Sequence, residues 1–232
     1  MKKKIIGTLL LSTVVLSGLA TPAFAAGTAT TNGDITFTEP TGPVDPLDPT
    51  DPNKPVDPTN PTKPDPENPT TGQEGALTLD VVPNLPFGTH EIESGTKTYP
   101  VDATKNDSPY LQVSDRRGVG ADGQAQGWNV SVTVSDFANG SQKLEGATLN
   151  FGSSTVKKPD SNTSVAPSSA AITGLDSSDS ATTIFTAAKD HGLGTWLSVY
   201  DPTNIILTVP EAAVGTFTAT LTWDLTAGPT AP

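Results

Sequence analysis

Side chains that could carry out catalysis are few and far apart in this sequence. There is no cysteine, and the two histidines, His90 and His191, are 101 residues apart. Serine is abundant, but the G-x-S-x-G sequence that would present a nucleophilic serine on a strained turn is absent. We therefore predict no catalytic residues and no enzymatic activity. His90 is expected on a surface strand or loop, and His191 at the C-terminal end of a short helix.

Acidic residues are the next candidates for ligand chemistry. Asp45, Asp48 and Asp51, and separately Asp176 and Asp179, have carboxylates close enough in sequence to hold Ca²⁺ weakly. Neither set matches a calcium-binding loop, and both lie in segments expected to be loops. The absence of cysteine also excludes thiolate-bound metals. The sequence therefore predicts no metal site and no cofactor.

Four residues have side chains suited to a carbohydrate or peptide ligand. Trp196 and Tyr200 follow a glycine-rich turn, and indole rings pack well on flat apolar partners such as sugar faces. Arg116 and Arg117 form a basic pair, and guanidinium groups suit carboxylates. We predict these four as a candidate ligand surface. A place at the edge of the core is the alternative for Trp196, and a salt bridge to Asp115 or a loop cap is favoured for the arginines.

The N-terminus is typical of a secretion signal. Three lysines, residues 2–4, precede an apolar run over residues 5–19, and Ala23-Phe24-Ala25 forms a cleavage site, so we predict a signal peptide over residues 1–25. Its removal takes away three lysines and no acid, which changes the net charge from −12 to −15. A chain this acidic is not expected to bind nucleic acid or anionic lipid by simple charge attraction.

Residues 26–75 are predicted to be a disordered lead and linker. The lead, residues 26–39, is polar except for one apolar patch, Ile35-Thr36-Phe37. From residue 40 to 64 every third residue is proline, which favours an extended polyproline II rod. Fully extended, residues 40–70 would reach about 95 Å. We interpret this segment as a solvated spacer; a ligand for domains with aromatic grooves is the alternative.

Residues 76–232 form the predicted folded domain. Alternating apolar and polar residues, rich in valine and threonine and separated by turn residues, indicate an all-β antiparallel sandwich or barrel-like fold. Residues 157–182 are expected to be an irregular excursion, and Ile184–Asp190 a short helix. The predicted strands are Leu77–Val82, Tyr110–Ser114, Trp128–Val134, Ala147–Phe151, Ile205–Val209 and Thr216–Leu225.

Two of these strands carry a tryptophan followed by an aliphatic residue two positions later. Alternation places Trp128 and Val130 on one face of their strand, and Trp223 and Leu225 on one face of theirs. Such apolar stripes indicate burial, so we predict that both tryptophans pack in the core, and that Trp223→Ala costs about 3–5 kcal/mol. An exposed aromatic platform for sugars is the competing hypothesis.

These two motifs, Gly127-Trp128-Asn129-Val130 and Leu221-Thr222-Trp223-Asp224-Leu225, resemble the paired Trp-x-Leu motifs of the WxL domain family, with Val130 in place of the usual leucine. Stretches 82–88, 112–118 and 192–196 also fit the family in the expected order. The resemblance covers about residues 76–229. It implies a surface protein of Gram-positive bacteria that binds peptidoglycan non-covalently. Companion membrane-anchored surface proteins and the host extracellular matrix are the other implied partners.

The segment after Leu225 has no LPxTG sorting motif and no apolar tail, so retention at the surface is expected to be non-covalent. Two hypotheses follow. In the first, the secreted chain attaches to peptidoglycan in the cell wall. In the second, it is an interaction or adhesion module for a companion surface protein or a host matrix protein, and pairing of an edge strand is one mode by which it could bind. Binding to wall stripped of protein distinguishes them.

Overall fold

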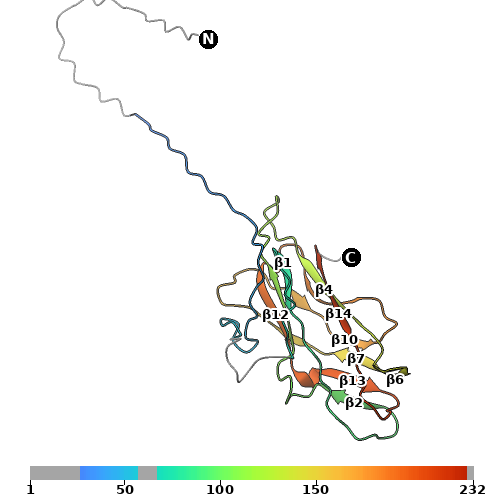
Figure 1. Cartoon of the computed structure of the whole chain (residues 1–232). Helices are drawn as coiled ribbons and strands as arrows, with labels where there is room; N and C mark the ends of the chain where they lie inside the picture. The colour runs from blue at the N-terminus through green and yellow to red at the C-terminus, as the bar shows by residue number, and fades with distance from the viewer. Residues whose placement is uncertain (1–26, 57–66, 229–232) are drawn as a thin grey trace, which may run out of the picture. The chain divides into compact units, whose positions relative to one another are not determined.

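The computed structural model describes residues 27–56 and 67–228, and the predicted signal peptide lies outside these ranges. The chain divides into two units, Met1–Phe37 and Thr38–Pro232. In the first unit, residues 27–37 have no secondary structure and are exposed. The second is built of antiparallel β-strands, which confirms the predicted fold class (Figure 1). No helix of the described ranges is long and apolar enough to be a membrane span.

Three four-stranded sheets make up the second unit. Sheet I has the order β1-β3-β12-β8, with strands Leu77–Val81, Tyr110–Asp115, Gly194–Tyr200 and Ser154–Lys157. Sheet II has the order β10-β7-β13-β2, with strands Ile172–Leu175, Thr148–Phe151, Ile205–Val209 and Lys97–Pro100. Sheet III has the order β14-β4-β11-β9, with strands Leu221–Ala227, Trp128–Val134, Thr182–Ala187 and Ser168–Ser169. A hairpin of β5 (Ala138–Asn139) and β6 (Gln142–Lys143) and a 3-10 turn, η1 (Pro202–Asn204), complete the described elements.

The predicted helix at Ile184–Asp190 was wrong. Thr182–Ala187 is strand β11, paired with β4 on one side and β9 on the other. Its residues are β-branched or aromatic as far as Thr186, which suits a pleated strand better than a helix. The excursion predicted over residues 157–182 contains strands as well, because β9 and β10 lie within it.

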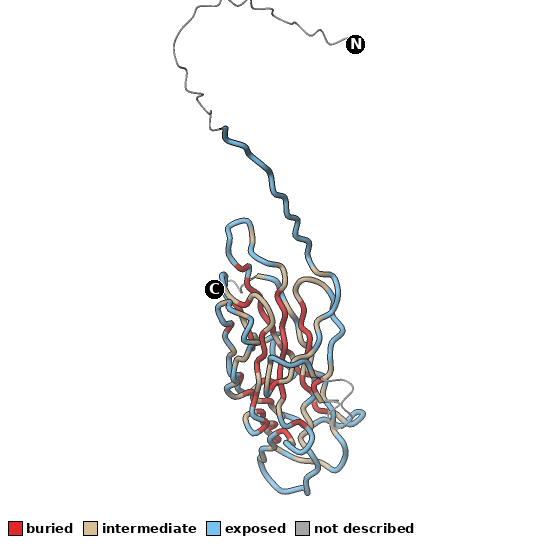
Figure 2. The backbone as a smooth tube through the Cα atoms, turned by 90° about the vertical axis from the view of Figure 1, so that its left-hand side faces the viewer, coloured by how far each residue is buried: buried red, intermediate tan, exposed pale blue. Residues whose placement is uncertain are grey.

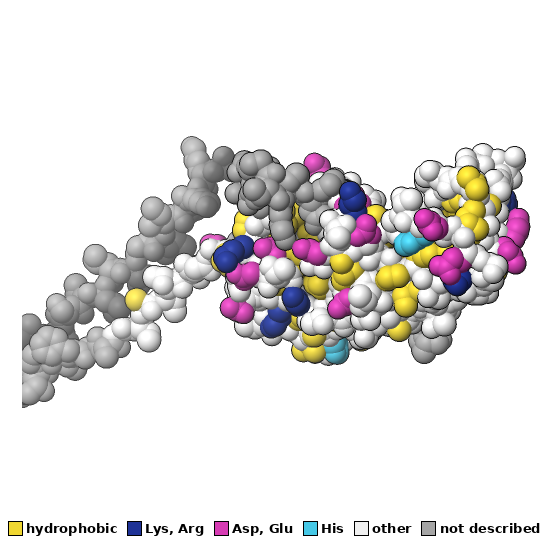
Figure 3. All heavy atoms as spheres, turned by 90° about the horizontal axis from the view of Figure 1, so that it is seen from below, with side chains coloured by type: hydrophobic (Ala, Val, Ile, Leu, Met, Phe, Trp, Pro, Cys, Tyr) yellow, Lys and Arg dark blue, Asp and Glu magenta, His cyan; other side chains and the backbone are white. Residues whose placement is uncertain are grey.

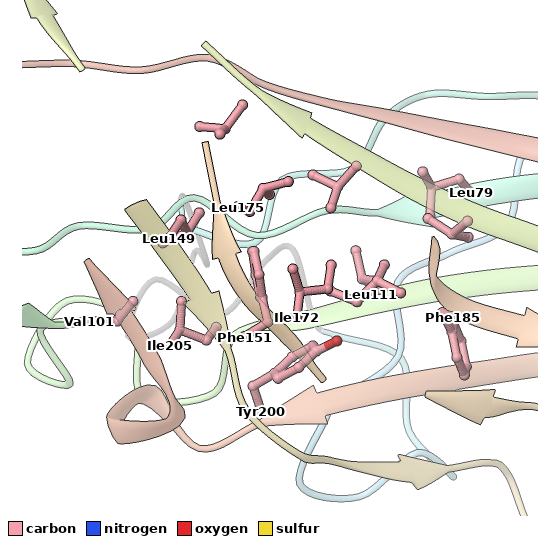
Figure 4. Close-up of a cluster of buried hydrophobic side chains, with 14 of the residues drawn as sticks. Leu79, Val101, Leu111, Leu149, Phe151, Ile172, Leu175, Phe185, Tyr200 and Ile205 are labelled. Atoms are coloured by element: carbon pink, nitrogen blue, oxygen red, sulfur yellow. The ribbon is translucent and has the colours of Figure 1, made fainter. Parts of the chain in front are cut away.

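One hydrophobic core joins the three sheets. Figure 2 shows buried residues along most of the strands, and Figure 4 shows side chains from different sheets converging. Phe151 of sheet II contacts Tyr200 of sheet I and Trp223 of sheet III, both edge-on, with ring centroids 5.9 Å and 6.0 Å apart. Burial of such rings supplies much of the stability that a cysteine-free domain needs.

A segment that we call the strap, residues 44–56, covers the outer face of sheet I. Leu47 packs against three buried residues of that face, Val81, Tyr110 and Leu197. Pro49 is buried, and its carbonyl accepts a hydrogen bond of 2.6 Å from Lys157 Nζ. This part of the expected spacer is therefore packed on the domain and is not a free rod. The spacing of the prolines predicts only the extended conformation of the strap. The position of the strap on the domain depends on its contacts with sheet I.

The contact between strap and sheet centres on Gln112, which is fully buried. Its Oε1 accepts a hydrogen bond from the Leu47 N–H at 2.7 Å, and its Nε2 donates to the Asp45 carbonyl at 3.1 Å and to Asp80 Oδ2 at 3.0 Å. Asp80 also accepts bonds of 2.6 Å from Thr78 and Ser114. Burial raises the pKa of Asp80, and these hydrogen bonds oppose that rise. The buried polar side chains of Gln112 and Asp80 on the outer face of sheet I thus have hydrogen-bond partners beneath the strap.

Candidate functional site

The two tryptophan motifs lie on neighbouring strands of sheet III. β14 pairs with β4 in antiparallel register, so that Leu225 stands opposite Val130 and Trp223 opposite Val132. Trp128, Val130 and Val132 are fully buried, and Trp223 and Leu225 are half-buried against the same core. In this arrangement both motifs face one core through alternate residues, with the β4 motif fully buried and the β14 motif half-buried.

Trp128 is fully enclosed by neighbouring residues. Its ring meets Phe185 edge-on at 4.9 Å between centroids, and its Nε1–H donates to the Gly192 carbonyl at 3.1 Å. Gly192 has a φ of +80°, and a Cβ there would lie 2.7 Å from Trp128 Nε1. Gly127 has a φ of +74°, and a Cβ there would lie 2.9 Å from the Ala188 carbonyl oxygen. The glycines near this motif are therefore required by close packing.

Trp223 has a different environment, because β14 is the last strand of its sheet. Its ring contacts Phe151 edge-on, and Trp223 also lines a groove of about 770 Å³. The walls of the groove come from the loop 82–92, from the segment 212–221 and from Tyr99 of β2. Figure 3 views the molecule from the end where β2 and β13 lie, and shows hydrophobic side chains beside a hollow in the surface.

The outer face of sheet III is polar and open. On β14 the side chains of Thr222, Asp224 and Thr226 are exposed, and they stand opposite Thr133, Ser131 and Asn129 of β4. Thr133 and Ser131 are half-exposed, whereas Asn129 is buried and donates to the Gly228 carbonyl at 2.7 Å. Sheet III therefore presents a row of hydroxyl groups with one carboxylate on its outer face.

The four residues predicted as a ligand surface do not come together on an open face. Trp196 and Tyr200 are each only 2 % exposed. Trp196 donates from Nε1 to the Leu193 carbonyl at 2.9 Å, and burial raises the pKa of Tyr200. Both lie on β12, a strand not anticipated from the sequence, so neither offers an aromatic face to a ligand.

The paired arginines hold parts of the chain together. Arg117 makes a two-point contact with buried Asp115, with Nη2 2.7 Å from Oδ2 and Nε 2.9 Å from Oδ1, and Nη2 also donates to the Gly127 carbonyl at 2.7 Å. Arg116 donates to the carbonyls of Gly42 and Gly75. These contacts agree with the structural alternative for this pair, a salt bridge to Asp115.

The two histidines lie in separate connections between strands. His90 is exposed in the loop 82–92, as predicted, where its ring packs on Tyr99 with centroids 4.3 Å apart. His191 follows Asp190, a non-glycine residue with a φ of +69°, in a turn between β11 and β12. Residues 182–187 form strand β11 and not a helix, so the prediction that His191 lies at the C-terminal end of a helix was wrong.

Comparison with known families decides what this architecture belongs to. Residues 25–229 match a family model described as WxL domain surface cell wall-binding. The chain belongs to the WxL family. No curated protein and no solved structure matches the WxL chain significantly. Family membership makes it a non-enzymatic, cell-wall-binding domain of the cell surface.

The extent of the match agrees with the structure of the strap. The WxL family model begins at residue 25 and so includes residues 44–56. Since the strap is packed on sheet I, the WxL domain contains more of the chain than the alternating strands alone would indicate.

Proposed function

We propose that the wall ligand of this WxL domain is peptidoglycan, and that the outer face of sheet III makes the contact. The observation that carries this proposal is the row of hydroxyl groups of Thr222, Thr133 and Ser131 on one face of the sheet, of which Thr222 is exposed and the other two are half-exposed. Sugar hydroxyl and acetamido groups both donate and accept hydrogen bonds, and threonine and serine hydroxyls do the same.

Charge favours peptidoglycan over the anionic polymers of the wall. The chain carries a net charge of −12, so a polyanion is repelled unless cations bridge the two. The hydroxyls on this face make no demand for charge pairing, and its one carboxylate, Asp224, adds to the repulsion of polyanions. Attachment through this face is reversible, with many weak hydrogen bonds along a repeating polymer adding up to a lasting contact.

The other sheets support this choice by exclusion. The outer face of sheet I is covered by the strap, and the aromatic side chains of Trp196 and Tyr200 are buried. The edge strand of sheet II, β2, is only four residues long and so offers a short surface to a polymer. Sheet III pairs over seven residues between β14 and β4, which is the longest ladder among the described residues.

The test is co-sedimentation of the mature chain with purified wall that has been stripped of protein and of anionic polymers. We expect the wild-type chain to sediment and the double variant Thr133→Val/Thr222→Val to bind about 30-fold more weakly, because the two lost hydroxyls remove hydrogen bonds worth about 1 kcal/mol each. Valine keeps the shape and the strand preference of threonine, so the fold is retained.

Sheet II offers a matched control. Thr98 and Thr208 form a cross-strand pair with one exposed and one half-exposed member, as Thr222 and Thr133 do. Thr98→Val/Thr208→Val should bind like the wild type. Equal loss in both double variants would refute the assignment to sheet III.

A companion surface protein or a host matrix protein is the competing partner. A chain that sediments with intact wall but not with stripped wall would favour the companion protein over peptidoglycan. Binding to immobilised matrix proteins with no binding to either wall preparation would favour adhesion to the host.

A further inference from the structure

The lead contains an apolar pair that the wall-binding function does not use. Ile35 and Phe37 are 77 % and 85 % exposed, and they are among the most exposed large apolar side chains of the described residues. The backbone of residues 27–39 has no secondary structure. Two apolar residues at positions i and i+2 point to the same side of an extended chain, with Thr36 pointing to the other. The lead is therefore a short strand sequence without a partner.

Strand β14 is an edge that lacks the usual protection. Within residues 27–56 and 67–228, β14 pairs only with β4, so the backbone groups along its other edge have no strand partner. Leu221–Ala227 is seven residues long and contains no proline and no lysine, the residues that commonly discourage pairing at an edge. By contrast, the edge strand β2 begins at Lys97 and ends at Pro100.

The groove lies beside this open edge. Leu221 and Trp223 of β14 line it together with Phe217, Phe87 and Tyr99 from flanking segments. A strand added to β14 with its apolar side facing the core would place its side chains in this groove. The spacing of Ile35 and Phe37 meets that requirement, since alternate residues of an added strand share one face.

We propose that residues 34–38 of one copy add as a strand to β14 of a second copy, with Ile35 and Phe37 seated in the second copy's groove. The contact uses two different surfaces of the chain, so it is head-to-tail and can continue from copy to copy. This inference does not depend on peptidoglycan being the wall ligand.

The anchoring of the lead favours a second copy over the same one. Arg116 binds the carbonyl of Gly42 at the end of the domain where β1 begins, and the loop that lines the groove follows the other end of β1. The five residues from Gly42 to Phe37 reach at most about 18 Å. β1 alone takes up about 17 Å of that distance, so its own groove is out of comfortable reach.

Disulfide trapping tests the contact directly, because the chain has no cysteine. When Ile35 and Phe37 face the groove, Thr36 faces outward on the same side as Thr222 of β14. We expect full-length mature chains carrying Thr36→Cys to form a disulfide-linked heterodimer with chains carrying Thr222→Cys under mild oxidation. Chains carrying Val165→Cys, an exposed position in a loop, are the matched partner that should not cross-link.

Sedimentation velocity of the cysteine-free chain gives a second readout. The wild type should associate with rising concentration, and Ile35→Ser/Phe37→Ser should weaken this association about tenfold or more, since few apolar anchors dominate such contacts. Val119→Ser/Val165→Ser removes two other exposed apolar side chains and should leave association unchanged.

Three results would overturn the proposal. One is a monomer at every concentration with cross-linking no greater than for Val165→Cys. Another is a disulfide within a single chain of the double variant Thr36→Cys/Thr222→Cys at high dilution, which would assign the groove to the chain's own lead. The third is association that survives Ile35→Ser/Phe37→Ser. Sedimentation of this variant with stripped wall is expected to stay unchanged, which separates this proposal from the wall-binding one.

Discussion

The strands β4 and β14 carry similar motifs in the same sheet, yet they bury them to different degrees. β4 has neighbours on both sides, and Trp128 is enclosed by Phe185 and the turn at Gly192. β14 has a neighbour on one side only, and Trp223 shares its surface between Phe151 and the groove.

This difference shows that strand position determines the role of the motif. A central strand makes its tryptophan a fixed part of the core, with its N–H satisfied by a backbone carbonyl. An edge strand leaves part of its tryptophan available to whatever lies in the groove. The two hypotheses for these residues, core packing and an exposed platform, therefore apply to different degrees at Trp128 and Trp223.

The largest effect is expected for Trp128→Ala. It should lower the free energy of unfolding by about 3–5 kcal/mol, because it opens a cavity in a fully buried site. Urea denaturation followed by circular dichroism measures this loss. A cost close to that of Trp223→Ala would remove the distinction between the centre and the edge of the sheet.

Gly192→Ala should destabilise the domain by about 2–4 kcal/mol, through the positive φ and through overlap of the new Cβ with Ala187 Cβ and with the Trp128 ring. Gly118→Ala is the matched control, since Gly118 has a φ of +72° with nothing within 4 Å of a Cβ. The control should cost about 1–2 kcal/mol. If both variants cost the same in urea denaturation, the packing of Gly192 against Trp128 does not matter.

Trp223→Ala should cost about 2 kcal/mol, less than the 3–5 kcal/mol expected for a fully buried tryptophan, because the ring is half-buried. The variant should remain folded by circular dichroism and should still sediment with stripped wall. A variant with unchanged stability that no longer binds wall would contradict the core role of Trp223 and restore the platform hypothesis.

The smallest effect is expected for the cross-strand pair of Val130 and Leu225. A double-mutant cycle with alanine at both positions should give a coupling energy of about 0.2–1 kcal/mol. Val130→Ala combined with Ile206→Ala, on sheet II, should be additive. Additivity in the first pair as well would mean that the two motifs do not support one another.

Strands with one solvated face could be predicted well from the sequence. Trp128–Val134 and Ile205–Val209 have the predicted bounds because their buried and less buried residues alternate. The strand Gly194–Tyr200 was missed because both of its faces are packed. Trp196 and Tyr200 face the main core, and Leu197 faces the strap, so apolar and polar residues do not alternate along it. The predicted strand Thr216–Leu225 begins as a strand only at Leu221, with Thr218 joined to Ala138 by a single bridge.

The candidate site was only partly predictable for a similar reason. The two motifs and their shared core follow from local alternation. The groove does not, because it forms between the loop 82–92 and the segment 212–221, which are distant in sequence. The burial of Trp196 and Tyr200 also depends on which elements cover β12, and no local pattern contains that information.

The strap has a mechanical consequence for a protein held at a cell surface. Among the described residues, hydrogen bonds between its backbone and the side chains of Gln112 and Lys157 attach the strap to sheet I, and no ladder between strands does so. Arg116 holds Gly42, just before the strap. We expect a pull on the N-terminus to load these bonds one after another and to free residues 42–56, up to about 50 Å of chain. We therefore expect the strap to detach and lengthen under tension before the sheets that hold the tryptophans bear the load.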